Sequence, residues 1–465
     1  MPKKKTALTI EERLQQALVP AEEQPYEVPE NWVWVRLGSL LKEIKNGTTI
    51  KQDKSGNGFS VTRIESLQNQ TIDLMRVGTI LETEKIKETD WYKSGDITLS
   101  HINSIEHVGK TALITDAMLP LVHGMNLLRL RFFEIYTPDL FQLYSQTYQY
   151  KNEIRSRINM AVNQVSINQK QLSSLEIPLP PLSEQQRIVE RIEELFAKLD
   201  EAKERLQEVA DSFAVRKAAI LHKAFTGELT KQWRLENGVS DESWEESNLG
   251  SFIACGPQNG LYKPKSSYGD GIRIIRIDAF YDGVIEQWDE LKRLRLDENE
   301  IECYSLNLND ILINRVNSMQ YLGKSALVRE LKDICVFESN IMRLSVDESR
   351  IYPEFLISFL NSQMGLNELR KNAKQAVNQA SINQQDIKNV IINLPALSEQ
   401  HEIVRLIDEL LAREHKAQQA AEQALASIDL MKKSILARAF RGELGTNKAS
   451  EASALELLKQ VLAEN

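Results

Sequence analysis

Two short Gly-Lys segments are the first places where residue type and spacing could support chemistry. Gly109-Lys110-Thr111 and Gly323-Lys324-Ser325 have the residue order that ends a nucleotide-binding phosphate loop. Such a loop needs a further glycine five residues upstream, because backbone amides must wrap the phosphates, and Ser104 and Ser318 occupy those positions. We therefore interpret both segments as turns that lead into strands, and their recurrence indicates a shared structural role.

Methyl transfer and metal chemistry lack the motifs that they require. An amino-methyltransferase that acts on a flipped base needs Asn or Asp before Pro-Pro and an aromatic residue after it, whereas Pro180-Pro181 lies between Leu179 and Leu182. No HExxH pair or other metal spacing occurs among the histidines, which are His101, His107, His123, His222, His401 and His415. We predict no catalytic and no metal-binding residues in this chain.

Composition limits the class of protein. The chain of 465 residues is 42% hydrophobic and 26% charged, a composition typical of folded proteins. Its length corresponds to about three domains of roughly 150 residues. Cys255, Cys303 and Cys335 lack CxxC spacing, so neither a disulfide framework nor a thiolate zinc site is expected. Because no apolar run approaches the roughly 20 residues of a membrane span, we expect a soluble, cytoplasmic protein without membrane contact. The net charge of -9 counts against nucleic-acid binding by this chain alone.

An internal repeat organises the chain. Residues 161–229 align without a gap on residues 376–444 at a constant offset of 215, and about 30 of roughly 70 aligned positions are identical. The clearest recurrences are Ala161-Val162-Asn163-Gln164, Ser166-Ile167-Asn168-Gln169 and Leu182-Ser183-Glu184-Gln185, which return as Ala376-Val377-Asn378-Gln379, Ser381-Ile382-Asn383-Gln384 and Leu397-Ser398-Glu399-Gln400. Weaker upstream matches pair Trp34 to Gly38 with Trp244 to Gly250, and Asn126 to Leu130 with Asn340 to Leu344. We interpret the whole chain as a tandem duplication.

The strongly repeated parts are predicted to be long helices. Ser183 and Ser398 are candidate N-caps, and Gln186 would complete a capping box in the first copy. Gly227 and Gly442 stand where each helix should end. Apolar residues follow heptad spacing, which predicts a coiled coil, at Ile188, Ile192, Leu195, Leu199, Ala202, Leu206, Val209 and Phe213 and at Ile403, Ile407, Leu410, Ala417, Ala421, Ala424, Ile428, Met431 and Ile435.

The divergent parts upstream of each helix are predicted to mix α and β structure. Short β-branched runs alternate with Gly and Asn turns, and one helix is expected after Pro138 and another after Pro353. Thr9 and Glu12 predict a capped N-terminal helix. The expected organisation is an N-terminal helix and connector at 1–30, mixed domains at 31–182 and 244–397, repeated helices at 183–230 and 398–445, a polar linker at 231–243 and a C-terminal amphipathic helix at 446–465.

The combination of these features resembles the DNA-specificity subunit of a type I restriction-modification enzyme. The resemblance covers about 400 residues in the family order, and no single motif carries it. The resemblance rests on the duplication and on several short motifs. These motifs are Leu179 to Gln185 and Leu394 to Gln400, Ile188-Val189 and Ile403-Val404, the Ala-Phe-x-Gly-Glu-Leu endings, the Gly95-Asp96-Ile97 and Asp310-Ile311 turns, and Trp233-Arg234.

The resemblance implies an α+β fold. Two mixed α/β target-recognition domains would be joined by long antiparallel coiled-coil helices, as a tandem duplication with pseudo-twofold symmetry. Each domain would read one half of a bipartite target in double-stranded DNA, while the helices would set the spacing and dock two modification subunits. Restriction and motor subunits would complete the nuclease. The subunit would catalyse nothing and bind no cofactor itself, because S-adenosylmethionine, ATP and Mg belong to those partners, which would also supply much of the phosphate contact.

Loops rich in donors and acceptors are the candidates for contact with base edges. One pair of loops follows Gly95-Asp96-Ile97 and Asp310-Ile311, and another pair surrounds Gly47 and Gly260. Because Asn163-Gln164 and Asn378-Gln379 are identical in both halves, they cannot read two different sequences, and we assign them to backbone contact or loop structure. The DNA-binding candidates are Asn46, Thr48, Lys51, Ser100, His101, Asn103, Lys110, Asn163, Gln164, Asn259, Lys263, Lys265, Asn314, Arg315, Asn317, Lys324, Asn378 and Gln379.

Partner docking is predicted on residues of the repeated helices outside the heptad seam. The candidates are Arg187, Arg191, Lys198, Arg405 and Arg413, although a solvated charged face would show the same residues, and the terminal helices around Leu14 and Leu458 are an alternative surface. Two other functions stay open. A coiled-coil scaffold that does not bind DNA would explain the acidity, and a DNA-recognition subunit of another phage-defence or modification complex would explain every feature.

Overall fold

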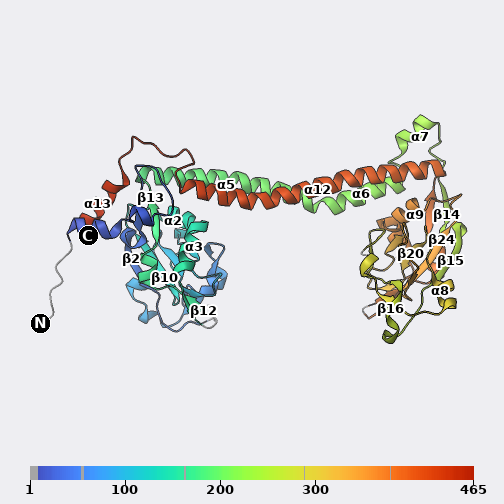
Figure 1. Cartoon of the computed structure of the whole chain (residues 1–465), viewed down its shortest axis with the longest axis horizontal. Coiled ribbons are helices and arrows are strands. Elements are labelled where there is room, and N and C mark those ends of the chain that lie inside the picture. The colour runs from blue at the N-terminus through green and yellow to red at the C-terminus, as the bar shows by residue number, and fades with distance from the viewer. Residues whose placement is uncertain (1–8, 54–56, 162–163, 287, 378, 465) are drawn as a thin grey trace. The chain divides into compact units, whose positions relative to one another are not determined.

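The structure is a computed structural model that describes residues 9–53, 57–161, 164–286, 288–377 and 379–464 (Figure 1). The chain divides into two compact units. Unit 1 comprises Met1–Arg205 and Ala424–Asn465, and unit 2 comprises Leu206–Gln423. Unit 1 is therefore discontinuous in sequence, because the end of the last long helix belongs to the first domain.

Three sheets form the frame of unit 1. A four-stranded antiparallel sheet has the order β2-β10-β7-β9, a three-stranded sheet has the order β11-β12-β8, and β1 pairs with β13. Small ladders join β3 to β6 and β4 to β5. The strands are β1 (Val33–Arg36), β2 (Leu41–Asn46), β3 (Phe59–Val61), β4 (Leu67–Gln68), β5 (Thr71–Ile72), β6 (Gly78–Ile80), β7 (Ile97–Ser100), β8 (Ile102–Asn103), β9 (Thr111–Leu113), β10 (Leu127–Phe132), β11 (Asn159–Ala161), β12 (Gln164–Ser166) and β13 (Glu176–Leu179).

Unit 2 repeats this frame. Its four-stranded sheet has the order β15-β24-β20-β22, its three-stranded sheet has the order β21-β26-β25, and β14 pairs with β27. The difference lies in the additional strands, where unit 2 has a β19-β16-β23 sheet and a β17-β18 ladder. The strands are β14 (Glu245–Asn248), β15 (Ile253–Asn259), β16 (Tyr268–Ile275), β17 (Phe280–Tyr281), β18 (Val284–Ile285), β19 (Arg293–Leu294), β20 (Ile311–Asn314), β21 (Val316–Asn317), β22 (Ser325–Leu327), β23 (Cys335–Phe337), β24 (Ile341–Val346), β25 (Lys374–Ala376), β26 (Gln379–Ser381) and β27 (Ile391–Leu394).

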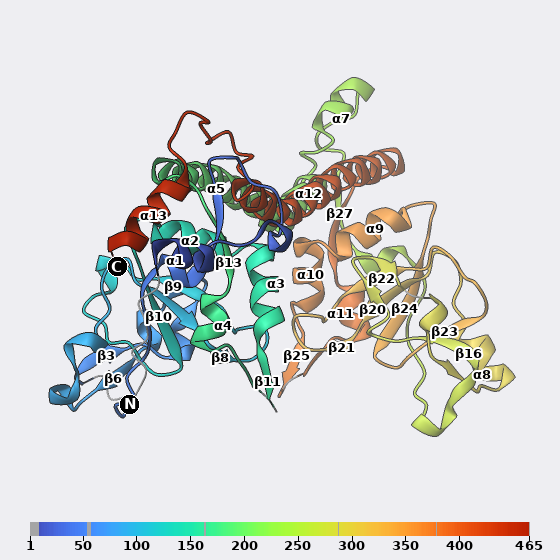
Figure 2. The same cartoon turned by 60° about the vertical axis from the view of Figure 1, so that its left-hand side comes forward.

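Helices cover these sheets, and several of them confirm the sequence predictions. Helices α2 and α9 begin at Pro138 and Pro353, and Thr9 caps α1 with the expected capping box to Glu12. The helices are α1 (Ile10–Ala17), α2 (Pro138–Tyr144), α3 (Tyr148–Arg157), α4 (Gln169–Ser173), α5 (Leu182–Asp211), α6 (Phe213–Phe225), α7 (Lys231–Asn237), α8 (Glu298–Tyr304), α9 (Pro353–Leu360), α10 (Gln363–Arg370), α11 (Gln384–Lys388), α12 (Leu397–Ala439) and α13 (Ala454–Glu464). The expected C-terminal helix is α13, which lies beside α1 (Figure 2), and Arg13 Nη1 donates to the Leu462 carbonyl at 3.1 Å.

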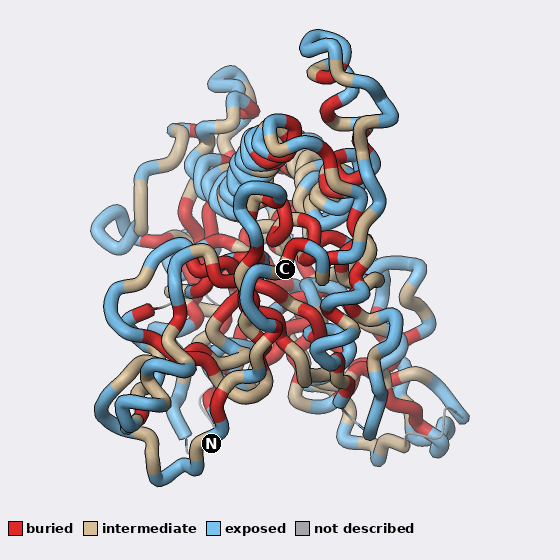
Figure 3. Tube along the Cα trace, turned by 90° about the vertical axis from the view of Figure 1, so that its right-hand side faces the viewer, coloured by how far each residue is buried: buried red, intermediate tan, exposed pale blue. Residues whose placement is uncertain are grey.

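The long helices run antiparallel within each unit. In unit 1, Lys432 of α12 pairs with Asp200 of α5 at 2.5 Å, and the segment after α12 meets the start of α5. In unit 2, Glu414 of α12 pairs with Arg216 of α6. Burial along the predicted heptads is uneven, because Val209 is 39% and Met431 50% exposed whereas six heptad residues are buried, namely Ile188, Ile192, Ile403, Ile407, Ala421 and Ile428. Exposed stretches run along the helices and through the loops (Figure 3).

Three local predictions about these helices were wrong. Both begin one residue earlier than expected, because the Pro181 carbonyl accepts from the backbone amides of Glu184 and Gln185, so Ser183 lies inside the first turn and is not its N-cap. The first helix is interrupted at Ser212, where the serine hydroxyl donates to the Val209 carbonyl at 3.0 Å and competes with the backbone ladder. The polar linker contains a helix, α7, which ends at Gly238 in a left-handed conformation with φ of 65°.

A buried carboxylate joins three distant segments in each unit. Glu184 of α5 accepts from Trp32 Nε1 at 2.7 Å, from Thr446 Oγ1 at 3.1 Å and from Asn447 Nδ2 at 2.8 Å. The glutamate is fully buried, and hydrogen bonds of this kind are what make a buried carboxylate tolerable. The residue before β1, the start of α5 and the segment that follows α12 therefore converge on one side chain.

The second copy builds the same junction with different donors. Glu399 accepts from Arg234 Nη1 at 2.7 Å, from Thr230 Oγ1 at 2.6 Å and from Trp244 Nε1 at 3.1 Å. Trp244 therefore corresponds to Trp32, and the sequence alignment of Trp34 with Trp244 was wrong.

The neighbouring glutamine holds the mixed domain to the helix. Gln185 accepts from the Thr137 amide at 2.9 Å and donates to the Ile135 carbonyl at 2.8 Å, at the start of α2. Gln400 accepts from the Tyr352 amide at 2.7 Å and donates to the Arg350 carbonyl at 3.1 Å, at the start of α9. The repeated Leu-Ser-Glu-Gln sequence is thus a structural junction, which explains its identity in two otherwise divergent domains.

Removal of the second carboxylate should destabilise unit 2. In Glu399→Ala the Arg234 guanidinium, of which 7% is exposed, would stay buried without its main partner, at a cost of about 3 to 5 kcal/mol in the free energy of unfolding. Urea unfolding followed by tryptophan fluorescence would measure it, because Trp244 contacts this carboxylate. The matched control is Glu409→Ala on the exposed face of α12, where we expect a change within about 0.5 kcal/mol. Equal stability of the two variants would contradict the role of the junction.

Candidate nucleic-acid interface

A repeated β-hairpin brings two of the candidate loops together in each unit. The hairpin β11–β12 pairs with β8, where Asn103 lies opposite Val165, and the hairpin β25–β26 pairs with β21, where Asn317 lies opposite Ala380. Gln164 and Gln379 are exposed on these hairpins, whereas Asn163 and Asn378 lie outside the described residues. The hairpin and the loop after β7 or β20 therefore form one surface in each unit.

Not every candidate on these loops faces outward. Ser100 is 1% exposed and its hydroxyl accepts from Asn103 Nδ2 at 3.0 Å, while Asn314 is 0% exposed. The side-chain nitrogen and oxygen of Asn314 have no hydrogen-bond partner among the described residues, whereas its backbone amide donates to the Lys324 carbonyl at 2.8 Å. Both side chains are buried and present no surface to a ligand, so Ser100 and Asn314 are not among the base contacts proposed below.

His101 and Arg315 occupy matching positions at the surface of the two units. His101 is half-buried, and burial lowers its pKa, partly offset by a hydrogen bond with the backbone of Asn126. Arg315 is also partly exposed, and its Nη1 donates to the Ser339 carbonyl at 3.1 Å while its backbone amide donates to Asn340. Each of the two side chains thus lies against the segment that opens the central strand, β10 or β24.

A cavity lies beside that segment in each unit. In unit 1 its volume is about 340 Å³, and it is lined by Gln52, Arg63, Ile64, Glu65, Met125 and Asn126. In unit 2 the volume is about 940 Å³, and the lining includes Tyr262, Lys263, Lys265, Arg276, Lys292, Arg293, Ser339 and Asn340. Asn126 and Asn340, which the sequence repeat had already paired, line the two cavities. We call them the unit 1 and unit 2 reading cavities.

The loop after β2 forms one side of the unit 1 reading cavity. The Thr48 amide donates to the His123 carbonyl at 2.8 Å, and a Cβ at Gly47 would lie 1.8 Å from the Gly124 carbonyl oxygen, so only glycine allows this approach. Asn46 and Lys51 are exposed on the same loop. The candidates of this loop are therefore held by backbone contacts and leave their side chains accessible.

The loop after β15 forms the corresponding side of the unit 2 reading cavity. The Gly260 amide donates to the Ile341 carbonyl at 3.0 Å, which fixes the loop beside Asn340. Asn259 and Lys265 are exposed, while Lys263 pairs with Glu300.

Tyr262 is 81% exposed in this loop and was missed by the sequence reasoning. Its position next to Lys263 was the available signal, because exposed aromatic rings between cations are typical of nucleic-acid surfaces. Three further cations of the cavity lining were also missed, namely Arg276 directly after β16, and Lys292 and Arg293 at the start of β19.

The two Gly-Lys turns lie outside the reading cavities. Lys324 Nζ lies 3.1 Å from the centroid of the Tyr281 ring and 4.9 Å from that of Tyr321, and burial lowers the pKa of this lysine. Lys110 is exposed and lines a separate cavity next to α3. The turn prediction is confirmed, because each turn leads into β9 or β22.

The docking candidates on the helices divide into two groups. Arg187 holds the C-terminal segment through two bonds to Glu451, at 2.9 and 2.7 Å, and it also donates to the Thr446 carbonyl. Its role is therefore internal. The remaining four are exposed and pair only with carboxylates of their own helix: Arg191 and Lys198 with Glu194, Arg405 with Glu402 and Glu409, and Arg413 with Glu409.

The described residues offer neither a metal site nor a membrane-spanning helix. Within them, no group of three or more His, Cys, Asp or Glu side chains could hold a metal ion. No helix in the described part of the chain is long and apolar enough to cross a membrane.

Comparisons with known proteins agree with this architecture. Residues 29–211 and 241–423 each match the family described as "Type I restriction modification DNA specificity domain". The StySPI specificity subunit of Salmonella potsdam is 30% identical over 94% of this chain and 96% of its own, and the EcoKI specificity subunit of Escherichia coli is 27% identical over the same shares. The crystal structure of the HsdS subunit from Thermoanaerobacter tengcongensis has the same fold, with a TM-score of 0.63 and 20% identity over 91% of this chain and all of that one.

Acidification should destabilise unit 1 through the histidine behind the β2 loop. Burial and the charge of Arg129 lower the pKa of His123 from 6.5 to about 3, so the folded state stays unprotonated where the unfolded state takes up a proton. Stability is therefore lost as the pH falls from 6.5 towards 3, and His123 alone should account for about 2 kcal/mol between pH 7 and pH 5. Urea unfolding at both pH values would show this loss reduced in His123→Gln and retained in His107→Gln, whose histidine is exposed. An equal pH response in the two variants would contradict the assignment.

Proposed function

Because the chain belongs to the family of type I restriction-modification DNA specificity domains, which it contains twice, we propose that it selects the DNA on which such a complex acts, with each unit reading one half of a bipartite target. The chain is a DNA-specificity subunit of a type I restriction-modification system. Subunits of this class are generally not catalytic, and the residues of this chain supply the contacts that recognise a sequence.

One observation supports the reading role above all. The two units share the same three frame sheets and the same repeated hairpin, yet unlike side chains surround the matching reading cavities at Asn126 and Asn340. A common frame with unlike donors and acceptors is what two different half-sites require, because each base pair presents its own pattern in the major groove. A scaffold that only holds proteins would have no need of two unlike polar cavities at one position of a repeat.

The candidate side chains would make different kinds of contact with DNA. Side chains around the reading cavities, such as Arg315 and Asn259, have the donors and acceptors for base edges, and Lys265 and Lys51 suit phosphates. Tyr262 could stack on an exposed base or sugar. The hairpin residues Gln164 and Gln379 are identical in both units and are proposed to contact backbone or to hold the loop.

Catalysis is assigned to partner subunits. Two modification subunits with S-adenosylmethionine would methylate the DNA, and restriction subunits would use ATP and Mg. The exposed cations of the long helices are the proposed docking sites, with Arg191 and Lys198 of α5 in unit 1 and Arg405 and Arg413 of α12 in unit 2. Because their present partners are exposed carboxylates of the same helix, exchange for a carboxylate of another protein would cost little.

The first test concerns Arg315. If its guanidinium pairs with guanine O6 and N7, Arg315→Ala should cost about 1 to 3 kcal/mol in binding to the target and relax the preference at one base pair of the unit 2 half-site. Binding of the full chain, with its modification subunits, to a set of single-base variants of the target would measure this.

The controls separate reading from support. His101→Ala, at the matching position of unit 1, should affect only the other half-site. Arg295→Ala removes a guanidinium whose side chain is 80% exposed and should leave the preference unchanged. An equal loss on every duplex would identify Arg315 as a phosphate contact and contradict base reading.

The second test concerns the spacer. We propose that the paired long helices set the number of base pairs between the half-sites. Insertion of four residues at each junction of the two units, between Arg205 and Leu206 and between Gln423 and Ala424, would lengthen both helices by about 6 Å, or one to two base-pair steps of about 3.4 Å. We expect the same half-sites with a spacer longer by one or two base pairs, mapped as methylated sites across a genome.

The same insertion placed after Gly238, in the loop that follows α7, is the control and should not change the spacer. Retained activity with unchanged spacing in the helix variant would show that the helices do not set the distance. Altered half-site sequences would show that the mixed domains are not the readers.

A further inference from the structure

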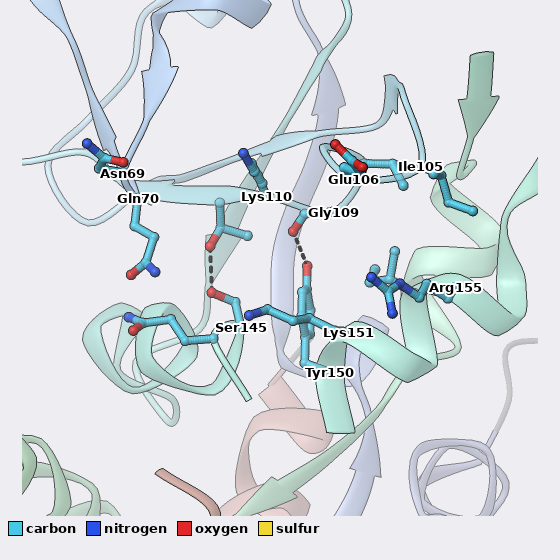
Figure 4. Close-up of a pocket in the computed structure, with 14 residues that line it drawn as sticks. Asn69, Gln70, Ile105, Glu106, Gly109, Lys110, Ser145, Tyr150, Lys151 and Arg155 are labelled. Carbon is cyan, nitrogen blue, oxygen red and sulfur yellow. Dashed lines mark hydrogen bonds between the residues drawn. The ribbon is translucent and has the colours of Figure 1, made fainter. Parts of the chain in front are cut away.

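Another cavity of unit 1 is lined by cations and lies apart from the unit 1 reading cavity. Its volume is about 400 Å³, and it lies between the Gly-Lys turn before β9 and the outer face of α3 (Figure 4). Lys110 reaches it from the turn, and Lys151 and Arg155 reach it from α3. We call it the α3 cleft.

The three cations of the α3 cleft have no partner among the described residues, with neither an ion pair nor a side-chain hydrogen bond. Lys151 and Arg155 are one helical turn apart, a spacing at which like charges repel. Burial and the nearby positive charges of Lys433, Arg155 and Lys110 lower the pKa of Lys151. One carboxylate, that of Glu106, lines the cleft. An anion bound there would relieve a repulsion that the fold leaves in place.

The cleft also offers neutral donors and a firm floor. Asn69 and Gln70 line it from a turn in which both residues have positive φ, of 44° and 64°. Tyr150 closes the floor, because its hydroxyl donates to the Gly109 carbonyl at 2.9 Å (Figure 4). Amide and ammonium groups around a rigid floor are the donors that phosphate oxygens accept from.

The corresponding part of unit 2 does not present free cations. Leu366 stands where unit 1 has Lys151. Arg370 stands at the position of Arg155, but its guanidinium donates to the carbonyls of Leu322 and Gln320 at 2.9 and 3.2 Å. Lys324, which corresponds to Lys110, lies on the Tyr281 ring. In unit 2 the surviving cations serve internal contacts, so the repeated frame does not by itself require the free cations of unit 1.

We propose that the α3 cleft of unit 1 binds phosphates of the DNA backbone, independently of base sequence and without a counterpart in unit 2. This inference rests on the proposed function and adds to it an asymmetry, in which one half of the target carries an extra electrostatic contact. The free cations favour a polyanion, and the amide donors beside them suit phosphate oxygens.

The test compares two double variants of the full chain in complex with its modification subunits. Lys151→Gln with Arg155→Gln removes two cleft cations, and Lys93→Gln with Lys203→Gln removes two exposed cations of unit 1 outside the cleft. Affinity for a target duplex and for an unrelated duplex is measured over a range of salt concentrations. We expect the cleft variant to lose the same factor on both duplexes and to reduce the slope of log affinity against log salt by about 2, one for each phosphate contact. The control variant should match the unchanged protein.

Each other outcome has a defined meaning. An unchanged slope in the cleft variant would overturn the proposal, and if a modification subunit were also lost on gel filtration, the cleft would be a protein-docking site. Loss confined to the target duplex would also overturn it, since the cleft would then read bases. A reduced slope in a chain that shows no preference between the two duplexes would uphold the cleft and refute the proposed function. Because the four substituted side chains, Lys151, Arg155, Lys93 and Lys203, are exposed, equal unfolding midpoints should confirm that all variants fold.

Discussion

The buried glutamates Glu184 and Glu399 are the interactions on which the rest of the structure depends. A carboxylate that is removed from water must be compensated by hydrogen bonds or by a counter-charge. Here the donors come from the segment before the first strand of a domain and from the segment that follows the opposite helix. Neither carboxylate can be satisfied until these segments meet the start of the repeated helix, so completion of each domain is coupled to pairing of the helices.

This coupling explains which parts of the repeat stayed alike. The residues that hold the domain to the helix, such as Gln185 and Gln400, are identical because their backbone partners at the starts of α2 and α9 have the same geometry in both units. The phenylalanines at the ends of the repeated helices are also alike, because each packs on an aromatic residue of its domain: Phe440 on Tyr144 in unit 1 and Phe225 on Phe355 in unit 2. The side chains around the reading cavities do not hold the domain to the helix, so they could diverge between the two units.

The local distribution of charge matters more than the total of -9. Along the helices the exposed cations are neutralised by carboxylates one turn away, as at Glu194 and Glu409. In the α3 cleft and at Lys265 of the unit 2 reading cavity, the cations form no ion pair with a carboxylate of the described residues. A polyanion near these surfaces would meet positive potential even though the chain as a whole is acidic.

The sequence alone determined the features that depend on local pattern and on self-similarity. The heptad spacing, the helices that begin at Pro138 and Pro353 and the capping box at Thr9 follow from residues a few positions apart, whose geometry is set by the backbone itself. The duplication follows from the recurrence of whole segments along the chain. The family resemblance belongs with them, because it rests on motifs quoted from the sequence.

Tertiary structure decided everything that depends on which distant segments meet. The assignment of Ala424–Asn465 to the first domain, the pairing of Trp32 with Glu184 and the helix in the expected linker all involve partners far apart in the chain. The reading surface shows the same limit. Ser100 and Asn314 have the polar character of surface residues, but strand pairing buries them, whereas Tyr262 is exposed because its loop lies outside the sheets. Periodicity and residue type cannot distinguish these cases, since burial is a property of the neighbours that folding brings together.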